Sequence, residues 1–480
     1  MKARRVLALG MTLTLVVAAC GRDEEEPIAS NPTGGSGSST PDTTPDGLEA
    51  GAFGDLGVVC GPAADGAELT ATDTGVTADS IQISTVSDPK FAGRPGLNQE
   101  LFDTAEAFSA WCNEKGGING RQIDLKERDA ELTQFQREVI AACSEGDFMM
   151  VGGGAVFDDV GQVERLDCEL PTVAGYVVTA VAAEADLTYQ PVPNPAGFLP
   201  VGDLTYLAEQ FPETTKNVGV LTGDIATTVV VGERYKEGIA QPQLGWDVVY
   251  DATYPAGGVD NWRPYIEEMQ SKGVQGLIWV GEPVNLGKML AEAEGLEFDL
   301  TWIRTDANHY DPKLTAEAGA AADGVYVRSV FAPFLDGAVE PDSASQQYID
   351  LIDQYDEGGI KAYLGVQGLS GWLLFATAAR DCGAELTRDC VFEKIGAYTE
   401  WSGGGLHAPI DLTTGRGGDC YNLYVVEGGE FTLADIGANN GIYNCDAANI
   451  TELTGDYGQG ATCENPAYAD DPKPSNCGSV

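Results

Sequence analysis

The sequence is poor in basic residues and in histidine. It has 27 lysines and arginines against 74 aspartates and glutamates, with only two histidines, and its formal charge at pH 7 is −47. A field of this sign repels phosphates, so nucleic acid and an anionic membrane surface are excluded as partners. We attribute the acidity to the solubility of a protein at a crowded surface, and a high-salt habitat fits it as well.

Signatures of metal binding and of catalysis are also missing. No C-x-x-C pair occurs, and with two histidines a zinc site is not expected, so we predict no metal and no cofactor. Ser370 lacks the spacing of a nucleophile elbow, and no histidine is placed by a motif to serve it. The glycines of Gly152-Gly-Gly154 are not followed by the Gly-Lys-Ser/Thr of a phosphate-binding loop. The sequence therefore predicts a protein that is not an enzyme.

The chain has one long apolar run, and it lies at the start. The basic residues Lys2, Arg4 and Arg5 precede an apolar stretch over 6–19, which is too short to span a bilayer and has the proportions of a signal peptide. The stretch ends in Leu-Val-Val-Ala-Ala-Cys20, which looks like a bacterial lipobox. We therefore expect a lipoprotein signal over 1–20 and lipidation of Cys20. An ordinary signal peptide with a chance cysteine is the alternative.

Lipidation of this cysteine predicts where the protein is found. No later segment is apolar enough to cross a membrane, so the acyl chains are the expected membrane anchor. We expect the protein on the cell surface or in the periplasm.

Ten cysteines remain after Cys20. An even number in an exported chain indicates disulfides rather than metal ligands. Closeness in sequence suggests three pairs, one of which would tie two consecutive helices, and leaves the full connectivity open. The three pairs are Cys143–Cys168, Cys382–Cys390 and Cys463–Cys477.

Composition divides the chain into a tether, a folded part and a tail. Residues 21–58 are rich in Gly, Ser, Thr, Pro and acidic residues, which predicts a disordered tether. From about 80 to 433, short apolar strands alternate with amphipathic helices, the pattern of parallel sheets covered on both faces. Two such runs, separated by the proline-rich 191–200, exceed a single compact core, so we expect two lobes. We expect residues 441–480 to form a Cys-rich C-terminal extension.

Three segments follow one another in an order known from one protein family. The most specific is 107–125, with the turn Gly-Gly-Ile-Asn-Gly-Arg at 116–121, and two weaker segments lie at 321–327 and 407–419. Together they resemble the type I periplasmic binding proteins, in particular the branched-chain amino-acid (Leu/Ile/Val) binding group of ABC transporters. The resemblance covers about 80–440. It implies an α/β fold of two Rossmann-like lobes with parallel sheets, joined by a three-crossover hinge.

The resemblance also implies lobe boundaries and a role. It places the first lobe at 76–199 plus 330–400 and the second at 200–329 plus 401–440. Such a protein captures a small molecule, here an amino acid or a related amide or carboxylate, between its lobes and delivers it to the permease of an ABC transporter. We expect a monomer. A ligand sensor, or a surface protein with a degenerate cleft, is the alternative on the same fold.

Solutes in open α/β sheets bind beyond the carboxyl ends of strands, so the loops after the strands supply candidate contacts. Residues 154–157 lack the hydroxyl that the family commonly offers to a substrate carboxylate, which weakens the case for an amino acid. Asp306 stands where the family often places a carboxylate for the substrate ammonium, and a solvated loop acid is the alternative. Tyr310 is either a ligand contact or part of the core. The candidate ligand-binding residues are Asp88, Phe91, Ala155, Val156, Phe157, Gly175, Tyr176, Asp224, Thr227, Glu282, Asp306 and Tyr310.

Overall fold

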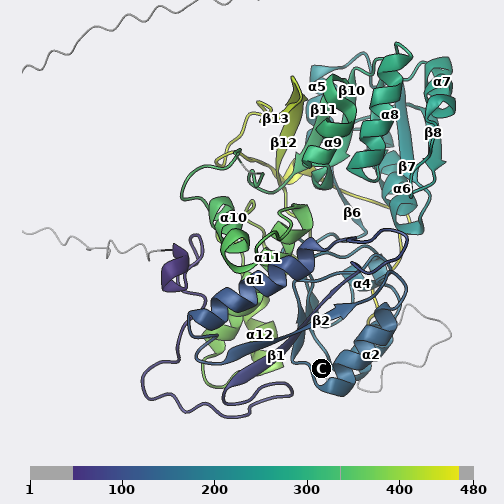
Figure 1. Ribbon diagram of the computed structural model, residues 1–480. Coiled ribbons are helices and arrows are strands. Elements are labelled where there is room, and N and C mark those ends of the chain that lie inside the picture. Colours follow the sequence, from purple (N-terminus) through teal and green to yellow (C-terminus); the bar gives the residue numbers. More distant parts are fainter. Residues whose placement is uncertain (1–46, 336, 464–480) are drawn as a thin grey trace, which may run out of the picture. The chain divides into compact units, whose positions relative to one another are not determined.

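The computed structural model describes residues 47–335 and 337–463. The predicted signal peptide, Cys20, the tether up to residue 46 and Cys477 therefore lie outside the described residues. Within the described part, no helix is both long enough and apolar enough to cross a membrane. This part folds into two main sheets covered by helices (Figure 1).

The first sheet has five parallel strands in the order β2-β1-β3-β4-β5. Its central strand β3, Met-Met-Val, is buried throughout, as expected of a parallel strand that has helices on both faces. The strands are β1 (Ser80–Ser87), β2 (Gln122–Asp129), β3 (Met149–Val151), β4 (Thr172–Val173) and β5 (Thr188–Tyr189).

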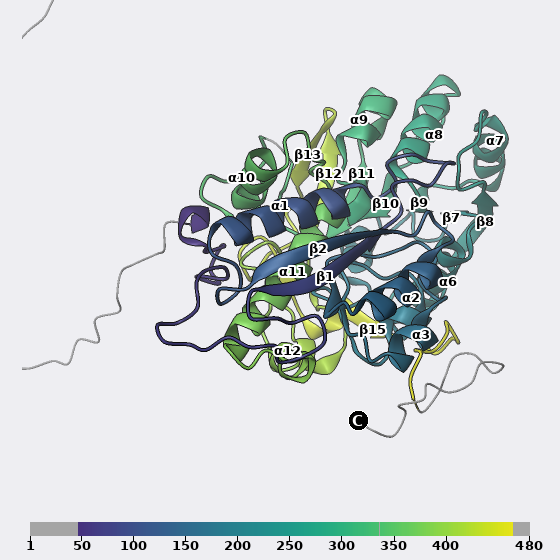
Figure 2. The ribbon, with the colours of Figure 1, turned by 60° about the horizontal axis from the view of Figure 1, so that its bottom comes forward.

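Neighbouring side chains of this sheet point to opposite faces. Met149 packs in the cluster that contains Phe108 and Trp372, whereas Met150 packs with Phe135 and Val139. One face is therefore covered by α1 and α11, which run alongside each other, and the other by α2 and α3 (Figure 2). The helices of this lobe are α1 (Glu100–Glu114), α2 (Phe135–Glu145), α3 (Gln162–Asp167), α4 (Ala180–Ala183), α10 (Ala344–Tyr355), α11 (Tyr363–Cys382) and α12 (Arg388–Ile395).

The second sheet has the order β13-β12-β11-β10-β9-β7-β8, with β14 paired to β12. Strands β7 to β11 are parallel, and β12 and β13 are antiparallel additions. Its parallel part repeats the strand order of the first sheet. The strands are β7 (Val218–Gly223), β8 (Val248–Tyr254), β9 (Gly276–Val280), β10 (Trp302–Asp306), β11 (Val325–Ser329), β12 (Cys420–Glu427), β13 (Glu430–Leu433) and β14 (Asn444–Cys445).

Alternation along β9 shows how this sheet is covered. Leu277 and Trp279 join the cluster that includes α7, α8 and α9, whereas Ile278 and Val280 pack with α5 and α6. The α-helices of this lobe are α5 (Gly202–Gln210), α6 (Ala226–Ala240), α7 (Arg263–Lys272), α8 (Pro283–Gly295) and α9 (Pro312–Ala318). The 3₁₀ helices of the described chain are η1 (Gly47–Ala50), η2 (Ala307–His309), η3 (Gly319–Ala322), η4 (Leu412–Thr414) and η5 (Ala447–Asn449).

The chain passes between the two sheets three times before its C-terminal segment. It leaves the first sheet after β5 through β6 (Phe198–Pro200), returns after β11 to α10, and leaves again after α12 to reach β12. The second and third passages meet at a bridge between Phe331 and His407. Two parallel sheets joined in this way confirm the fold class that strand–helix alternation and the resemblance predicted.

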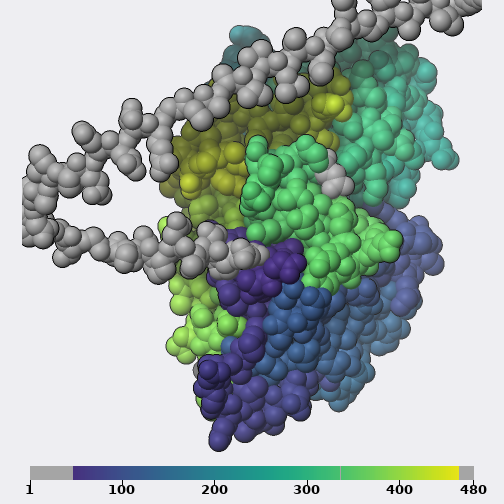
Figure 3. Space-filling view, turned by 60° about the vertical axis from the view of Figure 1, so that its left-hand side comes forward, coloured from purple at the N-terminus to yellow at the C-terminus, as the bar shows by residue number. Residues whose placement is uncertain are grey.

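The predicted tether is wrong at its C-terminal end. Phe53 and Val59 are buried in the main core, and the indole of Trp111 donates a hydrogen bond to the carbonyl of Leu48. Gly51 has a φ of +72°, and a Cβ there would lie 2.0 Å from the carbonyl oxygen of Cys60, so the turn requires glycine. Figure 3 shows this segment, in purple, lying against the first lobe. A few apolar anchors thus override the polar composition of the surrounding chain.

The predicted C-terminal extension contacts both lobes. We call residues 444–463 the strap. In the strap β14 pairs with β12, β15 (Ile450–Glu452) pairs with β6, and the carboxylate of Glu237 on α6 accepts hydrogen bonds from Thr454 and Gly455. Ala461 then exchanges backbone hydrogen bonds with the first lobe. The strap is therefore a fourth connection between the lobes.

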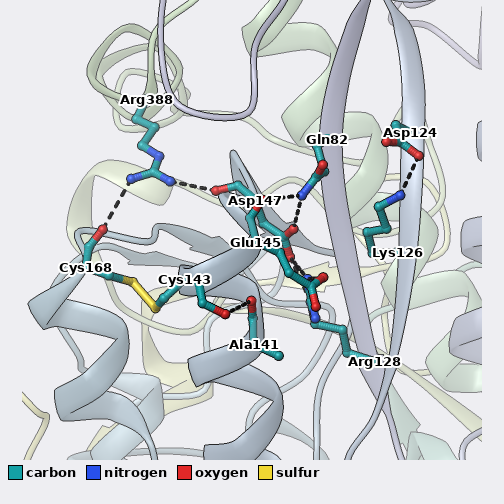
Figure 4. Close-up of polar contacts among 11 residues, drawn as sticks. Gln82, Asp124, Lys126, Arg128, Ala141, Cys143, Glu145, Asp147, Cys168 and Arg388 are labelled. Atoms are coloured by element: carbon teal, nitrogen blue, oxygen red, sulfur yellow. Dashed lines mark hydrogen bonds and ion pairs between the residues drawn. A yellow bond between two sulfur atoms is a disulfide. The ribbon is translucent and has the colours of Figure 1, made fainter.

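Disulfides join segments within each of the two lobes. The four pairs with both members described are Cys60–Cys112, Cys143–Cys168, Cys382–Cys390 and Cys420–Cys445. The second and third are pairs that sequence proximity suggested, and Cys463 is also disulfide-bonded. In Figure 4, Arg388 of α12 donates to the carbonyls of Asp147 and Cys168, while Arg128 pairs with the Asp147 carboxylate. Polar contacts thus join α12 to the segments that precede β3 and β4.

The packing of residues 47–60 leads to a stability prediction. Phe53 is fully buried, so Phe53→Ala should lower the free energy of unfolding by about 3–5 kcal/mol, measured by urea denaturation. The control is Val58→Ala, because Val58 is 39% exposed, and it should change stability by less than ~0.5 kcal/mol. Equal, small effects of both substitutions would show that this segment is not part of the core.

Candidate functional site

A cavity of about 300 Å³ is lined by residues of both lobes. The first lobe contributes the loop after β4, the chain after β5 and the start of α11. The second contributes α6 and the ends of β10 and β11. A larger and more open hollow of about 580 Å³, between residues 195–198 and 454–459, lacks the loops that follow the sheet strands, so we regard the smaller cavity as the site. Its polar lining residues are Tyr176, Gln190, Asn194, Arg234, Tyr235, Asp306, Asn308, Arg328, Tyr363 and Gln367.

The floor of the cavity rests on a buried charge network in the second lobe. Arg304 is fully buried; its Nε lies 2.6 Å from Asp203 of α5, and its Nη1 lies 2.9 Å from Asp306. The guanidinium carbon also lies 4.3 Å above the ring of Tyr235 on α6. The Tyr235 hydroxyl is 2.9 Å from each carboxylate oxygen of Asp306. These contacts balance a charge that would be costly to bury alone, while Arg304 Nη2 and Asp203 Oδ1 have no hydrogen-bond partner among the described residues.

Asp306 remains ionised in this setting. Burial opposes the charged form, but the charges of Arg304 and Arg328, with hydrogen bonds from Arg304 and Tyr235, bring the pKa of Asp306 below its ordinary value. Its side chain is 36% exposed, so one side still faces the cavity. Asp306 therefore already has its cationic partners within the protein, and a substrate ammonium is not needed to explain its position.

Two further guanidinium groups line the cavity. Arg234 donates to the carbonyls of Pro195 and Phe198 and to the side chain of Asn194, all neutral acceptors. Arg328 makes no side-chain hydrogen bond or ion pair with any residue in the described ranges, and its Nε is buried without an acceptor there. The cavity thus presents positive charge in a strongly acidic protein.

The first lobe supplies neutral polar groups. The hydroxyl of Tyr176 accepts a hydrogen bond from Asn98 at 2.8 Å, and burial raises the pKa of Tyr176, which keeps it neutral. A Cβ at Gly154 would lie 2.4 Å from the Tyr176 ring, so glycine is required beneath it. Gln367 is 5% exposed, and its Oε1 has no hydrogen-bond partner among the described residues. These groups face the arginines of the second lobe across the cavity.

Comparison with known proteins places the chain in a family. Residues 96–430 match the family described as periplasmic binding protein. The chain belongs to this family. Its members are extracytoplasmic solute-binding proteins and not enzymes, which agrees with the non-enzymatic role expected from the sequence. No curated protein sequence matches the chain.

Solved structures of periplasmic binding proteins share the fold. A branched chain amino acid ABC transporter protein from Thermus thermophilus with bound valine is 15% identical over 77% of this chain and 98% of its own, with a TM-score of 0.63. A fatty acid ABC transporter substrate-binding protein from Thermomonospora curvata is 14% identical over 79% and 98%, with a TM-score of 0.61. A branched-chain amino acid binding protein from Streptococcus pneumoniae in complex with isoleucine is 14% identical over 74% and 99%, with a TM-score of 0.59. At these identities the likeness concerns the fold.

Of the twelve candidate residues, Tyr176 and Asp306 line the cavity of this binding protein. Asp88 is fully buried, and its two carboxylate oxygens accept hydrogen bonds from the amides of Leu132 and Val156. It therefore holds loops of the first lobe together. Tyr310 is also a core residue, since it stacks on Tyr424 at 4.1 Å.

The other candidates lie around the cavity rather than in its wall. Ala155 borders an inner cavity of about 30 Å³. Gly175 packs so closely that a Cβ would lie 2.4 Å from the carbonyl oxygen of Gly152. Glu282 forms an ion pair with Arg94 at 2.8 Å. The remaining candidates, which also lie outside the cavity wall, are Phe91, Val156, Phe157, Asp224 and Thr227.

Sequence reasoning missed the residues that carry most of the charge. Arg234 and Tyr235 lie within helix α6, and Arg328 lies in strand β11, whereas the prediction considered only loops that follow strands. Two signals were available. One is Arg328 itself: the chain has few basic residues, and this one lies in the largely apolar strand Val325-Tyr-Val-Arg-Ser329. The other is the helical spacing of Val231, Arg234 and Tyr235, which places them on one side of α6.

In the structure, Ser370 has a histidine partner, His407, that no sequence motif predicted. The Ser370 Oγ lies 2.9 Å from His407 Nε2, and the indole of Trp401 donates to the same Oγ. His407 Nδ1 lies 2.8 Å from the carbonyl of Ala408, which makes Nδ1 the donor and Nε2 the acceptor. Both side chains are buried and neither lines the cavity, so the pair ties the third passage to α11 of the first lobe.

The buried histidine predicts a pH dependence of stability. Burial lowers the pKa of His407 to about 4, against an ordinary value of 6.5. The unfolded chain therefore binds a proton below about pH 6.5 that the native state does not bind until about pH 4. As the pH is lowered from about 6.5 to about 4, the free energy of unfolding should thus decrease by about 1.4 kcal/mol per pH unit for this group. His407→Gln should remove that contribution to the slope, measured by urea unfolding between pH 4.5 and 7.5.

Ser370→Ala is the matched control for this measurement. It removes the hydroxyl that donates to His407 but keeps the titrating imidazole. It should lower stability at every pH and leave most of the slope in place, because burial, the main cause of the low pKa, remains. Parallel stability curves for the wild type and His407→Gln would contradict the assignment of a neutral, buried His407.

Proposed function

We propose that this protein captures a small molecule between its lobes and delivers it to the permease of an ABC transporter. The observation that carries the proposal is the cavity of about 300 Å³, because both lobes contribute to its wall. A solute there contacts both halves, so binding favours the closed arrangement of a hinged protein. The lobe boundaries that we propose remain 76–199 plus 330–400, and 200–329 plus 401–440.

An ion pair that joins the lobes supports closure around a solute. Arg94 follows β1 in the first lobe, and Glu282 follows β9 in the second; their side chains are 49% and 41% exposed. An exposed pair of this kind contributes about 0–1 kcal/mol, and salt weakens it. It therefore assists closure without locking the lobes, and the solute supplies the larger part of the free energy.

The composition of the cavity suggests a solute with a polar end and an apolar end. Arginine, tyrosine and amide side chains share the wall with Val177, Val192, Leu199 and Val231. We propose an amino acid or a related amide or carboxylate. Structural neighbours whose names refer to valine, isoleucine and fatty acids are consistent with solutes that have a polar and an apolar end.

The proposed role includes attachment to the membrane. We infer that Cys20 carries the lipid anchor, that residues 21–46 form a tether, and that the binding protein acts as a monomer at the cell surface or in the periplasm. The sequence of the first 20 residues supports this, since a basic start, an apolar run and a cysteine follow in order.

A thermal-shift screen with matched variants tests the proposed function. A solute at about 100 times its Kd should stabilise the protein by about 2.7 kcal/mol, an easily measured rise in Tm. Val231→Trp fills the cavity wall and should abolish the response. Val230→Trp, at the adjacent position, is 37% exposed and should preserve it. A lack of response to amino acids, amides, short carboxylates, sugars and polyamines would instead favour a degenerate cleft.

A further inference from the structure

We propose that the solute is a small monocarboxylate without an ammonium group, and that Arg328 binds its carboxylate. This inference rests on the proposed function, because it concerns the same cavity, but it names a chemical class within it. Three sets of observations carry it: the lack of a hydrogen-bond acceptor for Arg328 among the described residues, the charge balance of the site, and the lack of an unpaired carboxylate in its described wall.

The side chain of Arg328 makes no hydrogen bond or ion pair with any described residue, and Asp306 acts on it through charge alone. In the β-ladder it lies opposite Asp306, at the end of β11, and its side chain lines the cavity. Its Nε is buried without an acceptor among the described residues. A buried guanidinium donor without an acceptor is unfavourable, and a carboxylate with two oxygens matches the geometry of its N–H groups. A bound carboxylate therefore supplies what the fold leaves unsatisfied.

The charges around Arg328 do not cancel. Asp306, its neighbour across the ladder, already accepts from Arg304 and Tyr235, and Asp203 is also paired with Arg304. Within the described ranges, the cluster thus contains three guanidinium groups, including that of Arg234, but only two carboxylates. His309 adds no charge at neutral pH, because burial lowers its pKa to about 4. One negative charge is needed to balance the site.

Arg234 strengthens the positive character of the cavity. Its described hydrogen-bond acceptors are two carbonyl groups and an amide, and the carboxylates of Asp306 and Glu184 act on it only through charge, without an ion pair. The carbonyl groups fix the orientation of the guanidinium, and its Nε is buried without an acceptor among the described residues. It adds long-range attraction to the carboxylate that Arg328 contacts.

The described wall of the cavity has no unpaired carboxylate to offset an ammonium group. Asp306 is the only carboxylate that lines it among the described residues; one side of it faces the cavity, but its charge is already paired with that of Arg304, and Tyr235 donates to it. An ammonium ion in the cavity meets the repulsion of Arg234 and Arg328. Gln367 offers a neutral carbonyl oxygen, which suits a hydroxyl or amide better than it offsets a full positive charge. A zwitterion is therefore disfavoured against the corresponding acid.

The rest of the wall suits a short branched or linear alkyl chain. Val177 and Val192 come from the first lobe, and Val231 and Val330 from the second lobe and the passage after β11. Apolar groups from both sides of the cavity enclose a tail once the carboxylate is held. We therefore choose three probes with one carbon skeleton: 4-methylpentanoate, 4-methylpentanamide and leucine.

The experiment compares the affinities of these probes by titration calorimetry at pH 7.5 and 150 mM salt, with the full-length protein. We expect 4-methylpentanoate to bind at least ten-fold more tightly than the neutral amide and than leucine. Arg328→Met should weaken binding of the acid by about 10- to 100-fold and leave the amide nearly unchanged. Arg328→Lys keeps the charge but not the paired donors, so it should retain part of the preference for the acid.

Controls separate a local effect from misfolding. Arg263→Met removes an exposed arginine of α7 that pairs with Glu267, and it should not alter the affinity for 4-methylpentanoate. An unchanged far-UV spectrum and Tm would show that Arg328→Met folds.

The remaining outcomes distinguish this inference from the proposed function. Equal or tighter binding of leucine or of the amide would overturn the carboxylate assignment and leave the solute-binding role intact. Unchanged binding of the acid to Arg328→Met would overturn the role of this arginine. Failure of all three probes would overturn the substrate class, and the Val231→Trp screen would then decide the proposed function by itself.

Discussion

The buried side chain of Arg304 is the constraint on which the candidate site depends. Its charge is taken out of water and is satisfied by Asp203, Asp306 and the ring and hydroxyl of Tyr235. These partners come from α5, from α6 and from β10 itself. The ion pair with α5 and the contacts of Tyr235 therefore fix two helices against the end of a strand, and Tyr235 and Asp306 at that junction line the cavity. Loss of one partner would leave an uncompensated charge in the interior, so the arrangement is tightly specified.

The connections between the lobes set the mechanical context of this site. Three passages of the chain are joined by a fourth, the strap, whose strand β15 pairs with β6 and whose end contacts the first lobe at Asp186. The strap is attached to α6 through Glu237, in the same helix that contributes Arg234 and Tyr235 to the cavity. The strap thus links α6, which contributes to the cavity wall, directly to the first lobe.

Much of the fold was predictable because its signals are local. Apolar runs of strand length, amphipathic helices and the Gly116–Arg121 turn each depend on a few neighbouring residues, and they predicted the alternation that the two sheets show. Two disulfides follow the same logic, since Cys143 and Cys168 end consecutive helices. The tether boundary failed because burial of Phe53 depends on contacts with distant helices, which polar composition does not reveal.

The sequence by itself determined the strand–helix alternation and the placing of Tyr176 and Asp306 at strand ends, because hydrophobic periodicity and chain direction decide both. It also determined the acidic character of the molecule. Only the tertiary structure decided that Arg304 neutralises Asp306, that Arg328 Nε has no acceptor among the described residues, and that His407 meets Ser370. These relations join residues from separate passages and helices, and the balance of buried charges depends on distances that no local pattern contains.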